Sequence, residues 1–265
     1  MSVSVSGYYA WHKREPSLHS REDAELANKI KGAFQSNRCV YGSPRIHAEL
    51  HAQGIHCARK RVARLMQELE LAAKRPRHRT VTTKSEEGAS VAPNLLQQDF
   101  HADQPNQKWT SDTTYIWTQE GWVYLAVVLD LFSRMVVGWS MAAIQDATLV
   151  VKALEMALAR RCPQAGLLHH GDSWQYLYER KLSRARGRQN GMLVSMSRTA
   201  NCYDNAVTES FFHSLKGESL DHESFQTRAQ ARRTTFEFIE SFYNRTRRHS
   251  TLQYMSPVEF ENLMC

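Results

Sequence analysis

The sequence predicts an α/β domain with a mixed sheet flanked by helices, preceded by a small all-α region. Two observations lead to this fold class. Before about residue 72, apolar residues recur at the i, i+3, i+4, i+7 spacing of amphipathic helices. From Trp109 onward, segments rich in Trp, Thr, Tyr, Val and Ile alternate with turn residues and one long helical pattern. A chain of 265 residues with 42% hydrophobic content can build both units.

Three helices are expected in the N-terminal region, residues 1–72. Residues 21–34 form the first, since Leu26, Ile30, Ala33 and Phe34 share one stripe. Pro44 suits the first turn of a second helix, Gly54 its end, and a third follows from about Ala58. Two short helices joined by a glycine-containing turn describe a helix-turn-helix.

The last of these helices is strongly basic near its start. Such a position is where a recognition helix contacts base edges and phosphates in a major groove. The alternative is an ordinary helical hairpin with a solvated basic face, but the clustering of charge favours DNA binding. The candidate DNA contacts are Arg59, Lys60, Arg61 and Arg64.

Cysteine and histidine usage favours neither a disulfide framework nor a zinc site. The five cysteines are scattered and form no CxxC pair. His47, His51, His56 and Cys57 lie close in sequence, yet lack the paired spacing of structural zinc, so surface or capping histidines are favoured. The first residues lack the apolar segment of a signal peptide, and no run reaches membrane-helix length. We therefore expect a cytoplasmic protein.

Residues 73–105 are expected to be a linker, because Pro, Gly, Ser, Thr and Gln interrupt any apolar period. Residues 106–265 then form the second domain. Its predicted elements are three consecutive strands, a helix, a fourth strand and two further helices. The strands are expected at 109–117, 122–132, 135–142 and 166–170, and the helices at about 147–161, 203–216 and 227–244. The last helix is expected to pack into the core through Phe236, Phe238, Ile239 and Phe242.

Charge is distributed unevenly along the chain, whose net charge is +7. Residues 1–79 carry 15 Lys and Arg against 7 Asp and Glu, or +8; residues 80–176 carry −4 and residues 177–265 carry +3. A basic front and an acidic middle indicate a polyanion-binding protein with a carboxylate-bearing centre.

Three carboxylates are candidates for that centre. Asp112 lies within a strand whose other residues are β-formers, where an acid is costly unless it serves a site. Asp172 follows the fourth strand directly. Glu209 lies on a predicted helix with Asn205, His213 and Lys216 on the same line, opposite the apolar Val207, Phe211 and Leu215.

Four segments then reveal a resemblance: WTSDTTYI, LLHHGD, SMSRTANCYDNAVTESFFHSLKGE and YNRTRRHSTLQYMSPVEFE. Together with YGSPRIHAEL and the basic helix, they closely resemble the second-frame protein of bacterial insertion-sequence transposases related to retroviral integrases. The resemblance covers about residues 5–262. It implies an RNase H-like integrase catalytic core with a DDE triad, here matched by Asp112, Asp172 and Glu209 as catalytic and metal-binding residues.

The resemblance also implies cofactors and partners. Two Mg²⁺ ions, with Mn²⁺ as a possible substitute, would bind the triad and support cleavage and strand transfer of DNA ends. The partners would be double-stranded DNA (element ends and target), an upstream-frame protein that is often fused to this one, and further copies of the chain, with the protein associated with the nucleoid. Asn205 and His170 are expected either to support the site or to contact DNA. Arg247 and Arg248 belong to a basic cluster that follows the last helix, which either forms a solvated cap or contacts the DNA backbone.

One segment departs from the family pattern. The family usually continues the second aspartate as Asp-Arg-Gly-Ser-Gln-Tyr, whereas Asp172 is followed by Ser173, Trp174, Gln175 and Tyr176, and the chain to residue 195 is longer. This favours an alternative function, a catalytically impaired DNA-binding relative acting as a regulator. A structure-selective nuclease that uses the same triad without strand transfer is a third.

Overall fold

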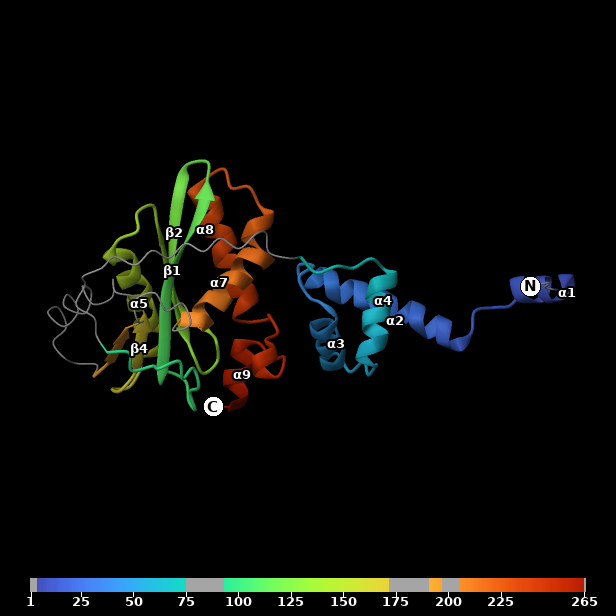
Figure 1. Cartoon of the computed structure of the whole chain (residues 1–265), viewed down its shortest axis with the longest axis horizontal. Helices are drawn as coiled ribbons and strands as arrows, with labels where there is room; N and C mark the ends of the chain where they lie inside the picture. The colour runs from blue at the N-terminus through green and yellow to red at the C-terminus, as the bar shows by residue number, and fades with distance from the viewer. Residues whose placement is uncertain (1–3, 75–92, 172–190, 197–204, 265) are drawn as a thin grey trace. The chain divides into compact units, whose positions relative to one another are not determined.

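The computed structural model describes residues 4–74, 93–171, 191–196 and 205–264 (Figure 1). The chain forms two compact units, Met1–Lys74 and Arg75–Cys265. Each is described by itself below. The part of the chain described here contains no helix long and apolar enough to cross a membrane.

The N-terminal unit is helical, as expected. Its elements are α1 (Val5–His12), α2 (Leu18–Ser36), α3 (Ser43–Ala52) and α4 (Arg59–Glu68). Helices α2, α3 and α4 pack on one another through fully or nearly fully buried Ile30, Ile46, Leu50, Val62 and Leu65. Gly54 has φ +77° in the turn after α3, a conformation that favours glycine. The helix-turn-helix prediction is confirmed, whereas α1 was not expected.

A five-stranded mixed sheet forms the centre of the second unit. The strands are β1 (Lys108–Thr118), β2 (Gly121–Asp130), β3 (Val136–Ala142), β4 (Leu168–Gly171) and β5 (Leu193–Met196), in the order β3-β2-β1-β4-β5. β1, β2 and β3 are antiparallel neighbours, and β4 runs parallel to β1 and β5. The sequence predicted the first four strands but not β5, which has only four residues.

Helices cover both faces of this sheet (Figure 1). α5 (Ala147–Arg161) packs on one face, where Trp109 and Val128 belong to its apolar cluster. α7 (Ala206–Glu218) and α8 (Arg228–Phe236) lie on the other side of β1 and β2. Gly138 permits the close approach of β3 to α5, because a Cβ there would collide with the Ala153 carbonyl oxygen and the Ala157 nitrogen.

The C-terminal helix differs from its prediction in one respect. Instead of one α-helix over 227–244, α8 continues as the π-helical segment η3 (Glu237–Tyr243), which buries Phe238, Ile239, Phe242 and Tyr243. Phe236, predicted to be a core residue, is 49% exposed, because Ala231 and Thr235 form the buried side of α8 and Phe236 lies about 100° around the helix from Thr235. Two short 3₁₀ turns, η2 (Leu220–His222) and η4 (Ser250–Leu252), and α9 (Pro257–Met264) complete the unit.

The segment before β1 joins the core. Leu96 and Ala102 are buried with Leu131, although both lie in the range expected to be linker. Met196 donates from its backbone nitrogen to the Pro93 carbonyl, so this segment runs beside β5. The second unit therefore includes residues that precede its first strand.

Candidate active site

Asp112 is half-buried in the middle of β1, beyond the end of the β1–β4 ladder. That ladder pairs only Lys108–Thr110 with Leu168–His170. Asp112 therefore lies in the part of β1 that follows its pairing with β4. Asp112 lies two residues from Thr110 and therefore on the same face of the sheet, the face that contacts α7. Its Oδ1 accepts a hydrogen bond from the Thr113 backbone nitrogen at 2.7 Å.

Glu209 lies in the first turn of α7, a favourable place for a carboxylate because the helix dipole is positive there. The side chain is half-buried, while Phe211 and Leu215 anchor the helix in the core. The neighbouring residue Thr208 has its Oγ1 2.8 Å from Thr110 Oγ1 of β1. This contact brings the strand that carries Asp112 and the helix that carries Glu209 together.

Asn205, expected to support the site, directly precedes α7 and is buried. Its Nδ2 donates to the Ser111 carbonyl at 3.2 Å, and its Oδ1 accepts from Thr208 Oγ1 at 2.8 Å. The side chain thus bonds the residue directly before Asp112 and the residue directly before Glu209.

His170, the second supporting candidate, is fully buried on β4. Its Nδ1 lies 2.8 Å from Ser195 Oγ of β5. Ser195 Oγ already accepts from the backbone nitrogens of Leu95 and Leu96, at 2.8 and 3.1 Å, so its single proton goes to His170. Nδ1 of His170 is therefore an acceptor, and a neutral ring carries its proton on Nε2.

Lys216 lies two turns after Glu209 on α7 and is half-buried near Asp112. Its Nζ stands 5.0 Å from the ring centroid of Tyr115, a cation–π contact, and Tyr115 stacks edge-on against Trp122. Burial lowers the pKa of the Lys216 ammonium, and the charges of Asp221 and Asp112 oppose that shift. The helical spacing in the sequence predicted that Lys216 lies on the same side of its helix as Glu209. No sequence pattern predicted that Tyr115 contacts Lys216.

Asp172 and the departing segment that follows it lie outside the described residues. Within the described ranges no group of three or more His, Cys, Asp and Glu side chains could hold a metal ion. Asp112 and Glu209 supply carboxylate oxygens, the ligands that Mg²⁺ prefers. Two half-buried carboxylates on facing elements fit a divalent cation in the chemistry of their donors.

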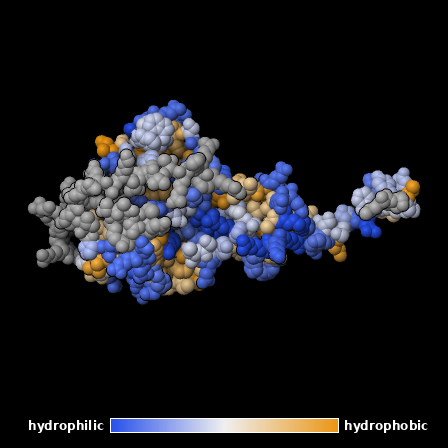
Figure 2. Space-filling view, viewed as in Figure 1, coloured by the Kyte–Doolittle hydropathy of each residue, from blue (hydrophilic) through white to orange (hydrophobic). Residues whose placement is uncertain are grey.

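The four candidate DNA contacts on α4 divide into two pairs. Arg59 and Lys60 are exposed. Arg61 and Arg64 instead hold Asp23 of α2, with N–O distances of 2.6 Å each. These two arginines lower the pKa of the Asp23 carboxyl. In Figure 2 the visible surface around α4 is largely hydrophilic, with some hydrophobic residues beside it.

The two C-terminal candidates have different surroundings. Arg247 is 3% exposed, and its guanidinium donates to both Glu218 oxygens at 2.6 Å and to Ser214 Oγ at 3.0 Å. A DNA contact by Arg247 would require breaking this buried pair. Arg248 is half-buried and donates to the Tyr254 carbonyl.

Three histidines of the N-terminal unit, His47, His51 and His56, contact one another or the backbone. His56 Nδ1 lies 3.0 Å from His51 Nε2, and His47 Nε2 lies 3.0 Å from the Cys57 carbonyl oxygen. The Cys57 thiol has a raised pKa because it is partly buried.

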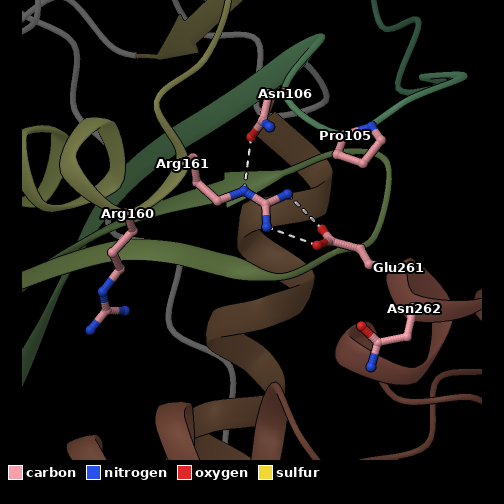
Figure 3. A pocket seen from close by; sticks show the side chains of 6 residues that line it. All are labelled: Pro105, Asn106, Arg160, Arg161, Glu261 and Asn262. Atoms are coloured by element: carbon pink, nitrogen blue, oxygen red, sulfur yellow. Dashed lines mark hydrogen bonds and ion pairs between the residues drawn. The ribbon is translucent and has the colours of Figure 1, made fainter. Parts of the chain in front are cut away.

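A shallow polar pocket lies between the end of α5 and α9 (Figure 3), and neither Asp112 nor Glu209 lines it. Arg161 donates to both oxygens of Glu261 at 2.8 Å and to Asn106 Oδ1 at 2.9 Å. Behind it, Asp130 is fully buried, and burial raises its pKa while the backbone nitrogens of Asn106 and Phe132 oppose the shift. These contacts fasten α9 to the sheet.

Family comparisons agree with this architecture. Residues 20–79 match the HTH-like domain family, and residues 102–202 and 209–264 match integrase core domain families. The expected integrase-core fold is thereby confirmed. The residue ranges of the matches contain Asp112, Asp172 and Glu209.

Whole-length relatives come from insertion sequences. The chain is 45% identical over 260 residues to the "Insertion element IS600 uncharacterized 31 kDa protein" of Shigella sonnei, covering 97% of this chain and 94% of that protein. It is 42% identical over 268 residues to "Transposase InsF for insertion sequence IS3A" of Escherichia coli strain K12, covering 99% and 91%. The solved HTLV-2 integrase catalytic core in complex with magnesium is 13% identical, covers 60% of this chain and 97% of that one, and has a TM-score of 0.43, too remote to inform function.

Proposed function

The chain belongs to the insertion-sequence transposases with an HTH-like domain and an integrase core, and we propose that it catalyses metal-dependent cleavage and strand transfer of insertion-sequence DNA ends. The catalytic carboxylates are Asp112, Asp172 and Glu209. The observation that carries this proposal is the hydrogen bond between Thr110 and Thr208, because it joins the elements that bear Asp112 and Glu209.

The three carboxylates would hold two Mg²⁺ ions, for which Mn²⁺ could substitute. Ions bound there would supply the positive charge that activates an attacking oxygen and stabilises a leaving oxygen at a phosphodiester. The half-buried positions of Asp112 and Glu209 keep both side chains accessible to a DNA strand while restricting their motion. His170, fixed by Ser195, stabilises β4 just before Asp172.

Cationic residues of the chain position the DNA. Lys216, held over Tyr115 and close to Asp112, contacts a phosphate next to the reacting one. Arg59 and Lys60 of α4 contact the DNA that the helix-turn-helix recognises, and Arg248 binds backbone near the catalytic unit.

The remaining partners follow from this activity. The upstream-frame protein, as a separate chain or a fusion, supplies additional recognition of the element ends. Because two ends must be cut and joined, the chain acts as a homo-oligomer on DNA. Its DNA binding places it at the nucleoid.

The test is an end-cleavage and joining assay with Mg²⁺ and DNA carrying the terminal repeats that flank the gene, with the upstream-frame protein added. Wild-type protein should nick and join the ends. Asp112→Asn, Asp172→Asn and Glu209→Gln should each abolish both steps and leave DNA affinity within about twofold. Specific binding by the wild type without cleavage would establish the regulator instead, and cleavage without joining would establish the nuclease.

A further inference from the structure

A chain of buried hydrogen bonds links β1 to the start of α7. Its members are Thr110, Ser111, Asn205 and Thr208, whose exposed fractions are 0%, 2%, 6% and 0%. Thr110 and Thr208 join at 2.8 Å, Thr208 and Asn205 at 2.8 Å, and Asn205 and the Ser111 carbonyl at 3.2 Å. The bond between Thr208 and Asn205 is local to the start of α7. The other two bonds join residues that are 94 and 98 positions distant in sequence.

The direction of each bond follows from the number of protons. Thr208 has one hydroxyl proton and donates it to Asn205 Oδ1. The bond between the two threonines must therefore be donated by Thr110. Asn205 closes the chain by donating its amide to the backbone of Ser111. Both threonine hydroxyl protons are used, and each bond has a single direction.

These bonds constrain what apolar packing cannot. The buried side chains of Phe211 and Leu215 hold α7 against the sheet, but apolar contact is non-directional and permits small slides of the helix along the strand. A hydroxyl pair weakens steeply with misalignment, and so fixes the register of Thr208 against Thr110. Catalytic groups must be held within about 0.5 Å of their productive geometry.

We propose that Thr110, Thr208 and Asn205 are positioning residues that set the distance of Glu209 from Asp112 and thereby the affinity of the site for its divalent cations. The proposal rests on the proposed function of these two carboxylates. Thr208 directly precedes Glu209, and Thr110 and Ser111 directly precede Asp112, so displacement of any link moves a carboxylate through one or two covalent neighbours.

The test replaces the hydroxyl without changing side-chain volume. Thr208→Val removes the donor to Asn205 and the acceptor of Thr110, whereas Thr208→Ser retains both. Thr235→Val is the matched control, because Thr235 is also fully buried and its hydroxyl donates at 2.8 Å, but to the Ala231 carbonyl within α8. Circular dichroism and thermal unfolding verify that each variant is folded.

Two readouts apply to the full-length chain. Equilibrium binding of Mn²⁺ alone, measured from the free ion by electron paramagnetic resonance, reports the site without turnover. End cleavage at saturating DNA reports kcat. We expect Thr208→Val to weaken Mn²⁺ binding and lower kcat by about 10- to 100-fold each, with DNA affinity unchanged, since supporting contacts of metal ligands have effects of this size. Thr208→Ser should stay within about threefold of wild type, and Thr235→Val should match wild type in both.

Thr110→Val provides an independent route from the strand side and should reproduce the Thr208→Val pattern. The proposal is overturned if folded Thr208→Val or Thr110→Val binds Mn²⁺ as tightly as Thr235→Val does, or if both effects appear equally in the control. Failure of the underlying function looks different: wild type and Glu209→Gln would then bind Mn²⁺ equally and neither would cleave DNA.

Discussion

Replacing Arg247 by Met should unfold the catalytic unit at a lower temperature and should not act primarily on DNA binding. Its guanidinium, 3% exposed, donates two bonds of 2.6 Å to Glu218, which is itself only 12% exposed. Removing one partner leaves a buried charge without compensation, which costs about 3–5 kcal/mol. For a unit of this size, about 2–4 °C per kcal/mol gives a decrease in Tm of roughly 6–20 °C.

The matched control is the exposed pair of Arg233 and Glu237, with side chains 82% and 48% exposed. Arg233→Met should lower the stability by no more than about 0.5 kcal/mol, because exposed i,i+4 pairs contribute little. Glu218→Gln should reproduce the destabilisation of Arg247→Met from the other side of the buried pair. Differential scanning calorimetry measures all three variants, and fluorescence anisotropy with terminal-repeat DNA measures affinity well below each Tm.

A different result would refute this reasoning. Suppose that Arg247→Met left Tm within about 1 °C of wild type, and that it lowered both the DNA affinity and its salt dependence by the amount expected for one phosphate. Arg247 would then be the DNA ligand that the sequence indicated.

Three further predictions concern other parts of the chain. Gly138→Ala should lower the Tm of the catalytic unit, because the added Cβ overpacks β3 against the backbone of α5 at a cost of about 1–3 kcal/mol or more. Gly32→Ala on α2, where a Cβ meets nothing within 4 Å, should be neutral or stabilising. Thermal unfolding measures both variants. Burial lowers the pKa of His169 from 6.5 to about 4. The full stability of the fold is therefore present above pH 6.5, and roughly 3 kcal/mol of the free energy of unfolding is lost as the pH falls from 6.5 toward 4. Urea unfolding at a series of pH values should show this loss, and His169→Gln should reduce it. Replacing Arg59 and Lys60 by uncharged residues should weaken DNA binding. It should also reduce the slope of log affinity against log salt concentration by about 0.9 for each phosphate contact that is lost. An unchanged slope would exclude these residues from the interface.

The secondary structure was predictable where local patterns are strong. The α5 prediction matches its observed range, and the strands around Asp112 lie within one or two residues of their expected positions. The short β5 and the π-helical η3 were not predictable. Four residues give β5 too little pattern, and a change of helical period arises from packing against the rest of the unit.

The ion-pair partners of the arginines could not be predicted from local sequence. Around Arg61 and Arg247 the sequence shows a basic helix or cluster, which reveals the charge of each side chain but not the group that it contacts. Their partners Asp23 and Glu218 lie 38 and 29 residues away and become neighbours only in the folded chain. Thr110 and Thr208 are similar cases: each resembles an ordinary residue of its element, and their bond spans 98 residues.

Ser195 has a mechanical consequence for the catalytic unit. Its one hydroxyl receives the backbone of Leu95 and Leu96 and gives its proton to His170, two residues before Asp172. The stretch of chain that precedes β1 and the strand that leads to the second aspartate therefore share one hydroxyl group as a hydrogen-bond partner. Displacing the chain at Leu95 and Leu96 would strain or break hydrogen bonds to the same hydroxyl that holds His170 on β4.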